Sequence, residues 1–541
     1  MYFTTPDVGW APVWARTLEK QIEEGAGDVI QLKRTRNSLL NISTRVPPEI
    51  LGLIFGWNVI PEGEYEHDEY AYYGLQKGSY NFLLVCHHWF EVAHRTPELW
   101  SYWGSTLEQW SKQCQHSGTA PLDLVLDGYN AGYIDVSLER SLRDALRDHA
   151  ASDSIRSIRF RGLGVDTPIL RFVTSSLVPD GEGVRRSSIE SVTFHGVDFS
   201  DFFARHYFPR LRHLHLTLPV RAVTPPWDHL RLHTTALTTL SLAVGYTSTA
   251  PTTSQLLSIL ASNPQLRNLD ISELKSIPHD NDNGPAFRVP LHHLKKLKLL
   301  GDSHFAFGLL HWLDLPEALD KTRLVFFDCR VEEISKKFGP YVGDYLRRDG
   351  RFRDGLGIYV APFSDTVSIE VNTVSGANAP ALRLGWRQSL ATFTATLKQE
   401  LPDDTQDKLR ADFITYLPTQ HVISYKGTMS ACSLQQVIPT MPNIQELYLM
   451  STKISDGFLR PGSDGPLVNA KLFPSLRFLH LEDVLIDDND WSPLVSYLTH
   501  QTSGGQALSL RLAGKSIHIC PHVAEAIKDL VEELFIDLAS K

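Results

Sequence analysis

Apolar residues recur through most of the chain in one short pattern, apolar-x-x-apolar-x-apolar. Alternating apolar positions place one side of a short strand in a core, so each copy predicts a strand. In the first block, successive copies begin 22 to 34 residues apart, which leaves room for a strand, a turn and a returning helix. The complete copies are Ile155/Ile158/Phe160, Ile189/Val192/Phe194, Leu211/Leu214/Leu216, Leu237/Leu240/Leu242, Leu266/Leu269/Ile271, Leu294/Leu297/Leu299, Ile444/Leu447/Leu449 and Leu476/Leu479/Leu481, and the truncated copies are Leu324/Phe326 and Leu510/Leu512.

The segments around these copies also repeat. A proline two residues before the first apolar position ends a preceding helix and favours an extended entry into the strand. Such prolines are Pro209, Pro264, Pro442 and Pro474. Residues 254–261, between two copies, carry leucine and isoleucine at helical spacing. The sequence thus predicts an α/β fold of stacked units, in which parallel strands are joined by right-handed crossovers.

Two regions depart from the repeat. Residues 328–440 hold only degenerate strand candidates, at Val367/Ile369/Val371, Leu382/Leu384 and Val422/Ile423/Tyr425. Residues 522–539 have the pattern of an amphipathic helix, with apolar residues at Val523, Ile527, Leu530, Val531, Leu534, Phe535 and Leu538. A stack of repeats exposes its last apolar layer, so we expect this helix to cap the C-terminal end.

The first hundred residues follow a helical pattern. Residues 1–40 are predicted to form a helical lead-in. Pro47 and Pro48 suit the start of a helix, because a proline there loses no hydrogen bond, and an apolar face follows them at i,i+4 spacing. A second helix is predicted over Tyr80–Ala93, and a third, short element begins at Pro97. Residues 58–79 hold five acidic residues and four tyrosines, which indicates an exposed acidic loop.

Composition narrows the class of protein. The 541 residues are 42% hydrophobic and 21% charged, values that are typical of globular proteins. The formal net charge of −10 disfavours general nucleic-acid binding, which requires a basic face. The five cysteines form no C-x-x-C pair, and this sparse, odd count suits a reducing compartment. With neither a signal peptide nor an apolar run long enough to span a membrane, we expect a soluble intracellular protein of the cytoplasm, the nucleus or both, which binds no membrane.

No motif for catalysis, metal binding or cofactor binding is complete. Gly514-Lys515-Ser516 resembles the end of a phosphate-binding loop, but Ser509 stands where the first glycine is required. Residues 280–284 resemble a calcium loop, but Pro290 stands in the position of its closing glutamate. We therefore predict a protein that is not an enzyme and uses no metal or cofactor. A catalytic site within residues 328–440 that no motif identifies stays open as an alternative.

An arginine cluster stands out in this acidic chain. Its members are Arg347, Arg348, Arg351 and Arg353. One interpretation is structural: carbonyl groups at a helix C-terminus attract cations, and a turn follows at Gly350. The other is a substrate or anion site, such as one for a phosphorylated peptide held by arginine side chains. Both interpretations stay open.

Residues 46–100 resemble an F-box. The resemblance rests on Pro47-Pro48-Glu49-Ile50-Leu51-x-x-Ile54-Phe55, then Leu84-Val85-Cys86-x-x-Trp89, then Pro97-x-Leu99-Trp100. The repeats behind this segment resemble the irregular leucine-rich repeats that fungal F-box proteins often carry. The resemblance implies three helices that bind an adaptor of the S-phase-kinase-associated (SKP) type and, through it, a cullin scaffold. The implied adaptor-binding residues are Pro47, Pro48, Glu49, Ile50, Leu51, Ile54, Phe55, Leu84, Val85, Trp89, Pro97, Leu99 and Trp100.

Pattern and resemblance together predict the organisation of the chain. Its parts are a lead-in at 1–40, an F-box at 41–105 with the acidic insert 58–79, a linker at 106–154, and a leucine-rich-repeat-like solenoid at 155–541. Helices this short should leave an apolar strip for a partner, formed by Ile50, Ile54, Phe55, Trp89 and Trp100. The implied function is substrate recognition in an SKP-cullin-F-box ubiquitin ligase, with an unknown protein substrate on the repeats. A scaffold that binds the adaptor without a ligase role is the other alternative.

Overall fold

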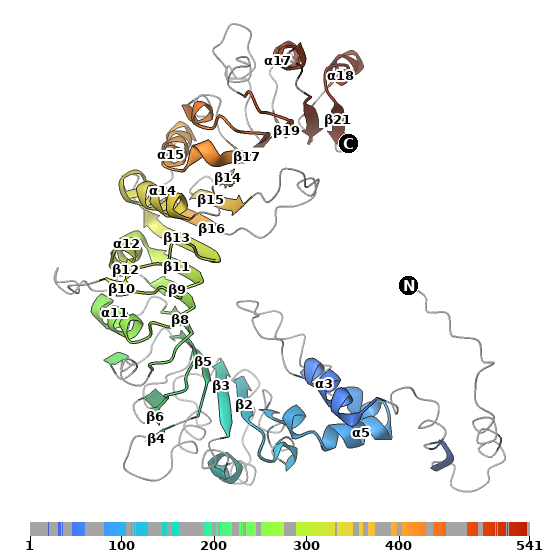
Figure 1. Ribbon diagram of the computed structural model, residues 1–541, viewed down its shortest axis with the longest axis vertical. Helices are drawn as coiled ribbons and strands as arrows, with labels where there is room; N and C mark the ends of the chain where they lie inside the picture. Colours follow the sequence, from blue (N-terminus) through green and yellow to red (C-terminus); the bar gives the residue numbers. More distant parts are fainter. Residues whose placement is uncertain are drawn as a thin grey trace. The chain divides into compact units, whose positions relative to one another are not determined.

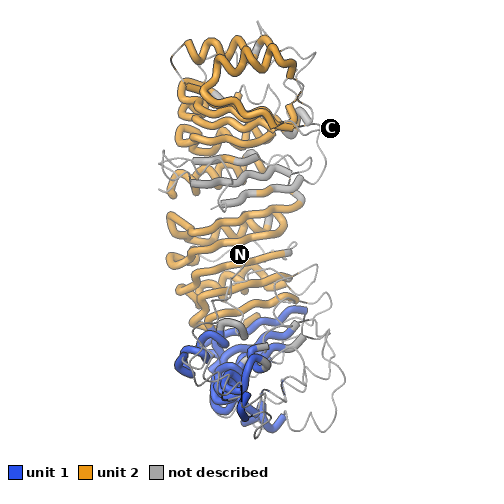
Figure 2. The backbone as a smooth tube through the Cα atoms, turned by 90° about the vertical axis from the view of Figure 1, so that its right-hand side faces the viewer, with its two compact units in different colours: residues 1–211 blue, residues 212–541 orange. Residues whose placement is uncertain are grey.

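The protein divides into two compact units, residues 1–211 and 212–541 (Figure 2). A computed structural model is the basis of the description. It describes residues 20, 31–33, 35, 46–59, 81–103, 110, 113, 115–127, 143–148, 154–161, 185–186, 188–196, 202–203, 206–218, 227–228, 230, 234–244, 250–274, 288–329, 333–349, 356–360, 366–373, 391–397, 403–428, 436–450, 473–484, 491–503, 505, 507–514, 517 and 519–537. Most of the predicted lead-in and acidic insert, the calcium-like segment 280–284 and the strand candidate Leu382/Leu384 lie outside these residues.

Four short helical segments lie between residues 48 and 100 of the first unit. They are α3 (Pro48–Val59), η3 (Asn81–Leu84), α5 (His87–His94) and η4 (Pro97–Trp100). The carbonyl group of Pro47 accepts hydrogen bonds from the amides of Ile50 and Leu51, at 3.0 and 3.1 Å, and so starts α3. The predicted continuous helix over Tyr80–Ala93 is wrong. Cys86 is extended, with φ −162° and ψ 167°, and this N-cap separates a 3-10 turn from α5.

These segments enclose a small core of their own. Leu51, Phe55, Phe82, Val92, Ala93, Leu99 and Trp100 are all buried in it. The rings of Phe55 and Phe82 stack with centroids 4.5 Å apart. The indole N–H of Trp100 donates to the carbonyl oxygen of Ala93 at 2.8 Å, so the only polar atom of this large side chain is satisfied inside the core. The first element, α3, is therefore fixed on its inner side by both α5 and η4.

Parallel strands follow directly after η4. They are β1 (Tyr102–Trp103), β2 (Leu122–Asp127), β3 (Ile155–Arg161) and β5 (Ser191–His195), each paired with the next, and a separate pair joins β4 (Arg185–Arg186) to β6 (His206–Tyr207). The run thus begins before residue 155, and the predicted linker over 106–154 contains a strand. The sequence pattern misses β2 because its leucines alternate directly, without the leading apolar-x-x step.

The second unit opens with five parallel strands in chain order. They are β7 (His213–Thr217), β8 (Thr239–Ala243), β9 (Asn268–Leu274), β11 (Lys296–Asp302) and β13 (Lys321–Cys329). The helices α11 (Thr253–Ala261), α12 (Ser303–Trp312) and α14 (Gly339–Arg348) lie on one side of these strands (Figure 1). The predicted helix at 254–261 is confirmed as α11, and a capping box of Thr252 and Gln255 starts it. A short pair joins β10 (Val289–Pro290) to β12 (Leu313–Asp314).

The middle of this unit leaves chain order, which explains why residues 328–440 fit the repeat poorly. Its elements are η6 (Ile334–Phe338), β14 (Leu356–Val360), β15 (Thr366–Thr373), β16 (Ala391–Leu397), α15 (Asp403–Thr415), η9 (Thr419–His421) and β17 (Val422–Gly427). In space the order is β13, β16, β15, β14, β17, with β15 antiparallel to both of its neighbours. Two of the degenerate strand candidates are confirmed, as β15 and β17.

Parallel chain order then resumes to the C-terminal end. The elements are η10 (Ile438–Thr440), β18 (Glu446–Met450), β19 (Phe478–Glu482), α17 (Ser492–Ser503), β20 (Ser509–Ala513), α18 (Pro521–Lys528) and β21 (Glu533–Asp537). The predicted capping helix over 522–539 is wrong in its second half, because the helix ends at Lys528 and residues 533–537 pair with β20 as a last parallel strand. The chain is thus a mixed α/β protein with parallel sheets. Within the described residues, no helix combines the length and the apolar character that crossing a bilayer requires.

Candidate protein-docking site

One face of α3 leaves three aliphatic side chains exposed. Ile50, Leu53 and Ile54 are 46%, 62% and 38% exposed, and their i, i+3, i+4 spacing puts them on one side of the helix. We call these three residues the α3 apolar face. Single exposed leucines are ordinary, but adjacent ones on a helix indicate an interaction surface. Val85, just before α5, and Phe90, within α5, are further exposed apolar residues of this helical segment.

The structure divides the predicted adaptor-binding residues into two groups. Leu51, Phe55, Leu99 and Trp100 are buried in the helical core, whereas Pro47, Pro48, Glu49, Ile50, Ile54 and Val85 are exposed. The expectation that Phe55 and Trp100 remain available on an apolar strip is therefore wrong, because both side chains are buried in the helical core. Pro97 is half-buried at the start of η4, and Leu84 belongs to η3 but its side chain lies outside the described part.

Trp89 joins the inside of this segment to its surface. Its ring lies 5.0 Å from that of Phe55 and packs against the helical core, yet the residue is half-buried. Its indole nitrogen is buried and has no hydrogen-bond partner. An unsatisfied buried donor costs about 1–3 kcal/mol, and a partner that supplies a carbonyl oxygen here would recover part of that cost. Leu53 and Phe90 were missed by sequence reasoning, although Leu53 stands at the i+3 position from Ile50.

Aromatic contacts fix the end of the helical segment. The imidazole rings of His94 and His116 lie 5.2 and 4.7 Å from the indole of Trp100, and 4.6 Å from each other. Burial lowers the pKa of His116, and the neighbouring His94 lowers it further. The lowered pKa suits His116 to packing as a neutral ring against Trp100.

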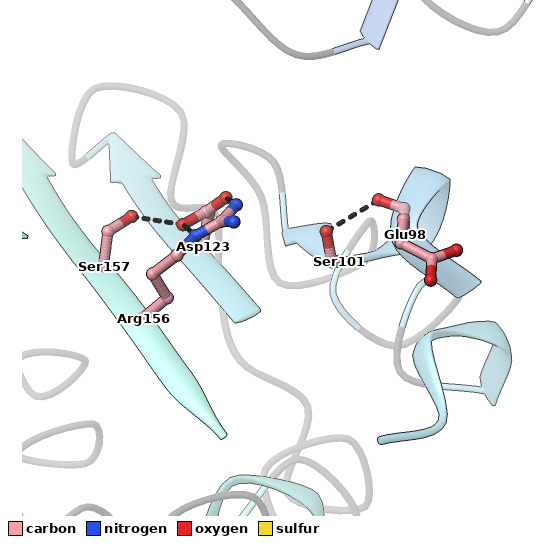
Figure 3. Close-up of polar contacts among 5 residues, drawn as sticks. All are labelled: Glu98, Ser101, Asp123, Arg156 and Ser157. Carbon is pink, nitrogen blue, oxygen red and sulfur yellow. Dashed lines mark hydrogen bonds and ion pairs between the residues drawn. The ribbon is translucent and has the colours of Figure 1, made fainter. Parts of the chain in front are cut away.

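A polar cluster links η4 to the first strands (Figure 3). The Asp123 carboxylate accepts from the Ser157 hydroxyl at 2.7 Å and from Nε of Arg156 at 3.0 Å, and it also forms an ion pair with that guanidinium group. The Asp123 amide donates to the carbonyl oxygen of Ser101 at 2.8 Å, and the Ser101 hydroxyl donates to that of Glu98 at 2.7 Å. The hydrogen bond and charge of Asp123 raise the pKa of Arg156 despite partial burial. This carboxylate has an evident structural role between β2 and β3.

The structure describes half of the arginine cluster. Arg347 forms an ion pair with Asp344 and donates to the Tyr416 carbonyl oxygen at 2.8 Å, and Arg348 donates to the Asp344 carbonyl oxygen at 3.4 Å. These contacts agree with the interpretation of a helix C-terminus, since α14 ends at Arg348. Arg351 and Arg353 lie outside the described residues, and the anion site stays a prediction. Among the described residues, no group of three histidine, cysteine or acidic side chains could hold a metal ion.

A second cluster, which sequence reasoning missed, lies on β18 and β19. The Tyr448 ring lies 5.3 Å from that of Phe478 and 5.4 Å from that of His480. Burial lowers the pKa of His480 to about 4, and the charges of Arg511 and Lys426 act in the same direction. His480 Nε2 is buried without a hydrogen-bond partner. Only the β-sheet register brings these side chains together, because Lys426 pairs with Tyr448, Tyr448 with His480 and His480 with Arg511.

No protein-family model matches the chain, and no curated protein is significantly similar to it. The functional argument therefore rests on the residues and contacts of the chain itself.

Proposed function

We propose that the chain is the substrate-recognition subunit of an SKP-cullin-F-box ubiquitin ligase. In this proposal residues 46–100 are an F-box that docks an SKP-type adaptor. The strands and helices behind it are irregular leucine-rich repeats that hold a protein substrate. Holding the substrate close to the ubiquitin-charged enzyme accelerates transfer by proximity, so the chain itself needs no catalytic group.

The observation that carries the proposal is the two-sided character of α3. Its inner side is closed by Leu51 and Phe55 in the core, so the α3 apolar face is not needed for folding the segment. Full burial of one such aliphatic side chain contributes about 1.5–3 kcal/mol, and three together could contribute several kcal/mol to an interface. An apolar helix face of this kind fits a hydrophobic groove on a helical partner.

The order of elements supports the same proposal. A proline-started helix, a 3-10 turn leading into a second helix, and a short Pro-x-Leu-Trp element follow one another around one core. The resemblance to an F-box rests on the order of the motifs and on their residue types. The exposure of Ile50, Ile54 and Val85, which belong to those motifs, adds a physical reason for a partner.

Co-purification with a recombinant SKP-type adaptor tests the proposal. The wild-type chain should capture the adaptor stoichiometrically, and Ile54→Glu and Leu53→Glu should each abolish capture while the chain keeps its cooperative melt. Ile536→Glu is the matched control, since Ile54 and Ile536 are 38% and 41% exposed, and it should leave capture unchanged. A folded wild-type chain that fails to capture the adaptor would overturn the proposal.

The ligase role needs a second readout. A complex reconstituted with adaptor, cullin and the ubiquitin-charging enzymes should ubiquitylate a substrate that is isolated through the repeats. Capture of the adaptor without any ubiquitylation of bound substrate would favour the scaffold alternative.

A further inference from the structure

Four cations form a compact group on two adjacent strands of the second unit. Lys296 and Lys298 lie on β11, and Lys321 and Arg323 lie on β13. The register pairs Lys296 with Lys321 and Lys298 with Arg323, so all four side chains share one face of the sheet. We call these four residues the basic strip. Strand geometry separates the paired residues by about 4.8 Å across the strands and by about 6.6 Å along them.

The strip is on the face opposite the helices. The intervening residues Leu297, Leu299 and Leu324 are buried. Phe326, also on the buried side, packs at 4.9 Å from Phe307 of α12, and the Thr322 hydroxyl lies 3.0 Å from that of Tyr345 in α14. Because this core fixes both strands from behind, the basic side chains project from a rigid base.

The charges of the strip are only partly compensated. Lys298 forms an ion pair with Asp270 on β9 at 2.9 Å. Lys321 and Arg323 are exposed and form no ion pair with any described residue. Like charges directly opposite each other on neighbouring strands destabilise a sheet. The basic strip therefore lowers the stability of the sheet, and its presence in an otherwise acidic chain indicates that the positive charge serves binding.

We propose that the basic strip binds an acidic, extended segment of the protein substrate through its Asp and Glu carboxylates. Carboxylates are the natural complement: the Arg323 guanidinium can donate two parallel hydrogen bonds to one carboxylate, and lysines supply further charge. In an extended segment, side chains at i and i+2 lie on one side about 6.6 Å apart, which matches the spacing between Lys296 and Lys298 along β11.

A nucleic acid fits this surface less well. The strip is two strands wide, and its neighbours on the same face at the level of Lys298 and Arg323 are Ser241 and Asp270 on one side and Thr392 on the other. A phosphate backbone needs a longer run of positive charge, and a chain with a formal charge of −10 repels it elsewhere. That the bound segment belongs to a ubiquitylation substrate rests on the proposed function, whereas binding of the acidic segment itself requires no adaptor.

Fluorescence anisotropy with a labelled ten-residue Glu-Ser repeat peptide tests the proposal on the full chain. We expect saturable binding that weakens as salt is raised, because the contacts are ionic and exposed. Lys321→Glu combined with Arg323→Glu should weaken binding about tenfold or more, since charge-assisted contacts are then replaced by repulsion. Lys336→Glu combined with Lys337→Glu is the charge-matched control, because both lysines are exposed on η6, and it should leave binding within about twofold of wild type.

Further measurements distinguish a carboxylate peptide from the other possible ligands. A Gln-Ser peptide of the same length should not bind. Equal loss in both double variants, no binding of the Glu-Ser peptide, or tighter binding of single-stranded DNA that depends on the same two residues would overturn the proposal. So would binding of a phosphorylated peptide when the carboxylate peptide does not bind. The Lys321→Glu, Arg323→Glu chain should still melt cooperatively and still capture the adaptor, so that failure of the strip and failure of the F-box proposal remain distinguishable.

Discussion

Two leucines of α3, only two residues apart, should respond in opposite ways to the same substitution. Leu51 is 2% exposed and packs in the helical core, whereas Leu53 is 62% exposed on the α3 apolar face. Leu51→Ala should destabilise the helical segment and thereby lower adaptor capture indirectly. Leu53→Ala should leave the segment as stable as wild type and reduce capture directly.

The structure sets the size of the difference. A buried Leu→Ala change costs about 2–5 kcal/mol, because it removes apolar contacts and leaves a cavity between Leu51's neighbours, among them Phe55 and Trp100. An exposed substitution usually changes stability by less than about 0.5 kcal/mol. Since about 1.4 kcal/mol corresponds to a factor of ten, amide exchange in α3 and α5 should accelerate at least about 30-fold in Leu51→Ala and hardly at all in Leu53→Ala.

Hydrogen–deuterium exchange with peptide resolution measures this directly on the full chain. Peptides from β18 to β20, in the other unit, serve as internal controls and should keep the wild-type exchange rate in both variants. If Leu53→Ala accelerated exchange in α3 as much as Leu51→Ala did, the two-sided description of this helix would be refuted. If neither variant reduced adaptor capture, the docking role of the α3 apolar face would be lost with it.

Two further outcomes are expected from the packing and the buried charges of the second unit. Gly343→Ala should lower the free energy of unfolding by about 1–3 kcal/mol, because an added Cβ would overlap the Tyr416 carbonyl oxygen. Gly308→Ala, which has open space around it, should instead raise that free energy by about 0.4–1 kcal/mol. Chemical denaturation measures both changes, and equal effects would contradict the close approach of Gly343 to Tyr416. The lowered pKa of His480, about 4 against an ordinary 6.5, means that the unfolded chain binds a proton more readily, so stability is present above pH 6.5 and is lost as the pH falls toward 4. His480→Gln should therefore show a smaller drop in melting temperature between pH 7 and pH 5 than wild type. The raised pKa of Glu446 stabilises the fold as the pH falls, but it does so equally in both proteins. Identical drops in the two proteins would show that His480 does not cause the loss of stability.

The repeat pattern predicts most strands correctly because it reports local burial. Apolar residues at alternating positions must face one core, and the strands β3, β5, β7, β8, β9, β11, β18, β19 and β20 lie where the pattern puts them. The α3 helix is predicted for a similar reason, since local signals mark it: Pro47 and Pro48 at its start and an apolar face at i,i+4 spacing. These are short-range rules that require no knowledge of neighbouring strands.

The features that the sequence does not predict depend on long-range contacts. Residues 533–537 have apolar side chains that suit a helix or a strand, and only the free edge of β20 makes them a strand. Similarly, the motif cannot show that Phe55 lies inside and Leu53 outside, because which side of α3 is covered depends on α5 and η4. The basic strip and the Tyr448–His480 cluster exist only through register between strands that are distant in sequence.

The spatial order β13, β16, β15, β14, β17 has a consequence for synthesis on the ribosome. β13 is complete at Cys329, but its neighbour β16 begins only at Ala391, and β14 likewise has to wait for β17. At about 5–20 residues per second, translation of the intervening segment lasts on the order of 3–12 s. For that time the nascent chain presents a strand edge whose partner does not yet exist, next to the basic strip that β13 carries. Unpaired strand edges template aggregation. We therefore expect a chaperone to engage the nascent chain at the segment from β13 to β17, and a transcript truncated within this segment to yield an insoluble product.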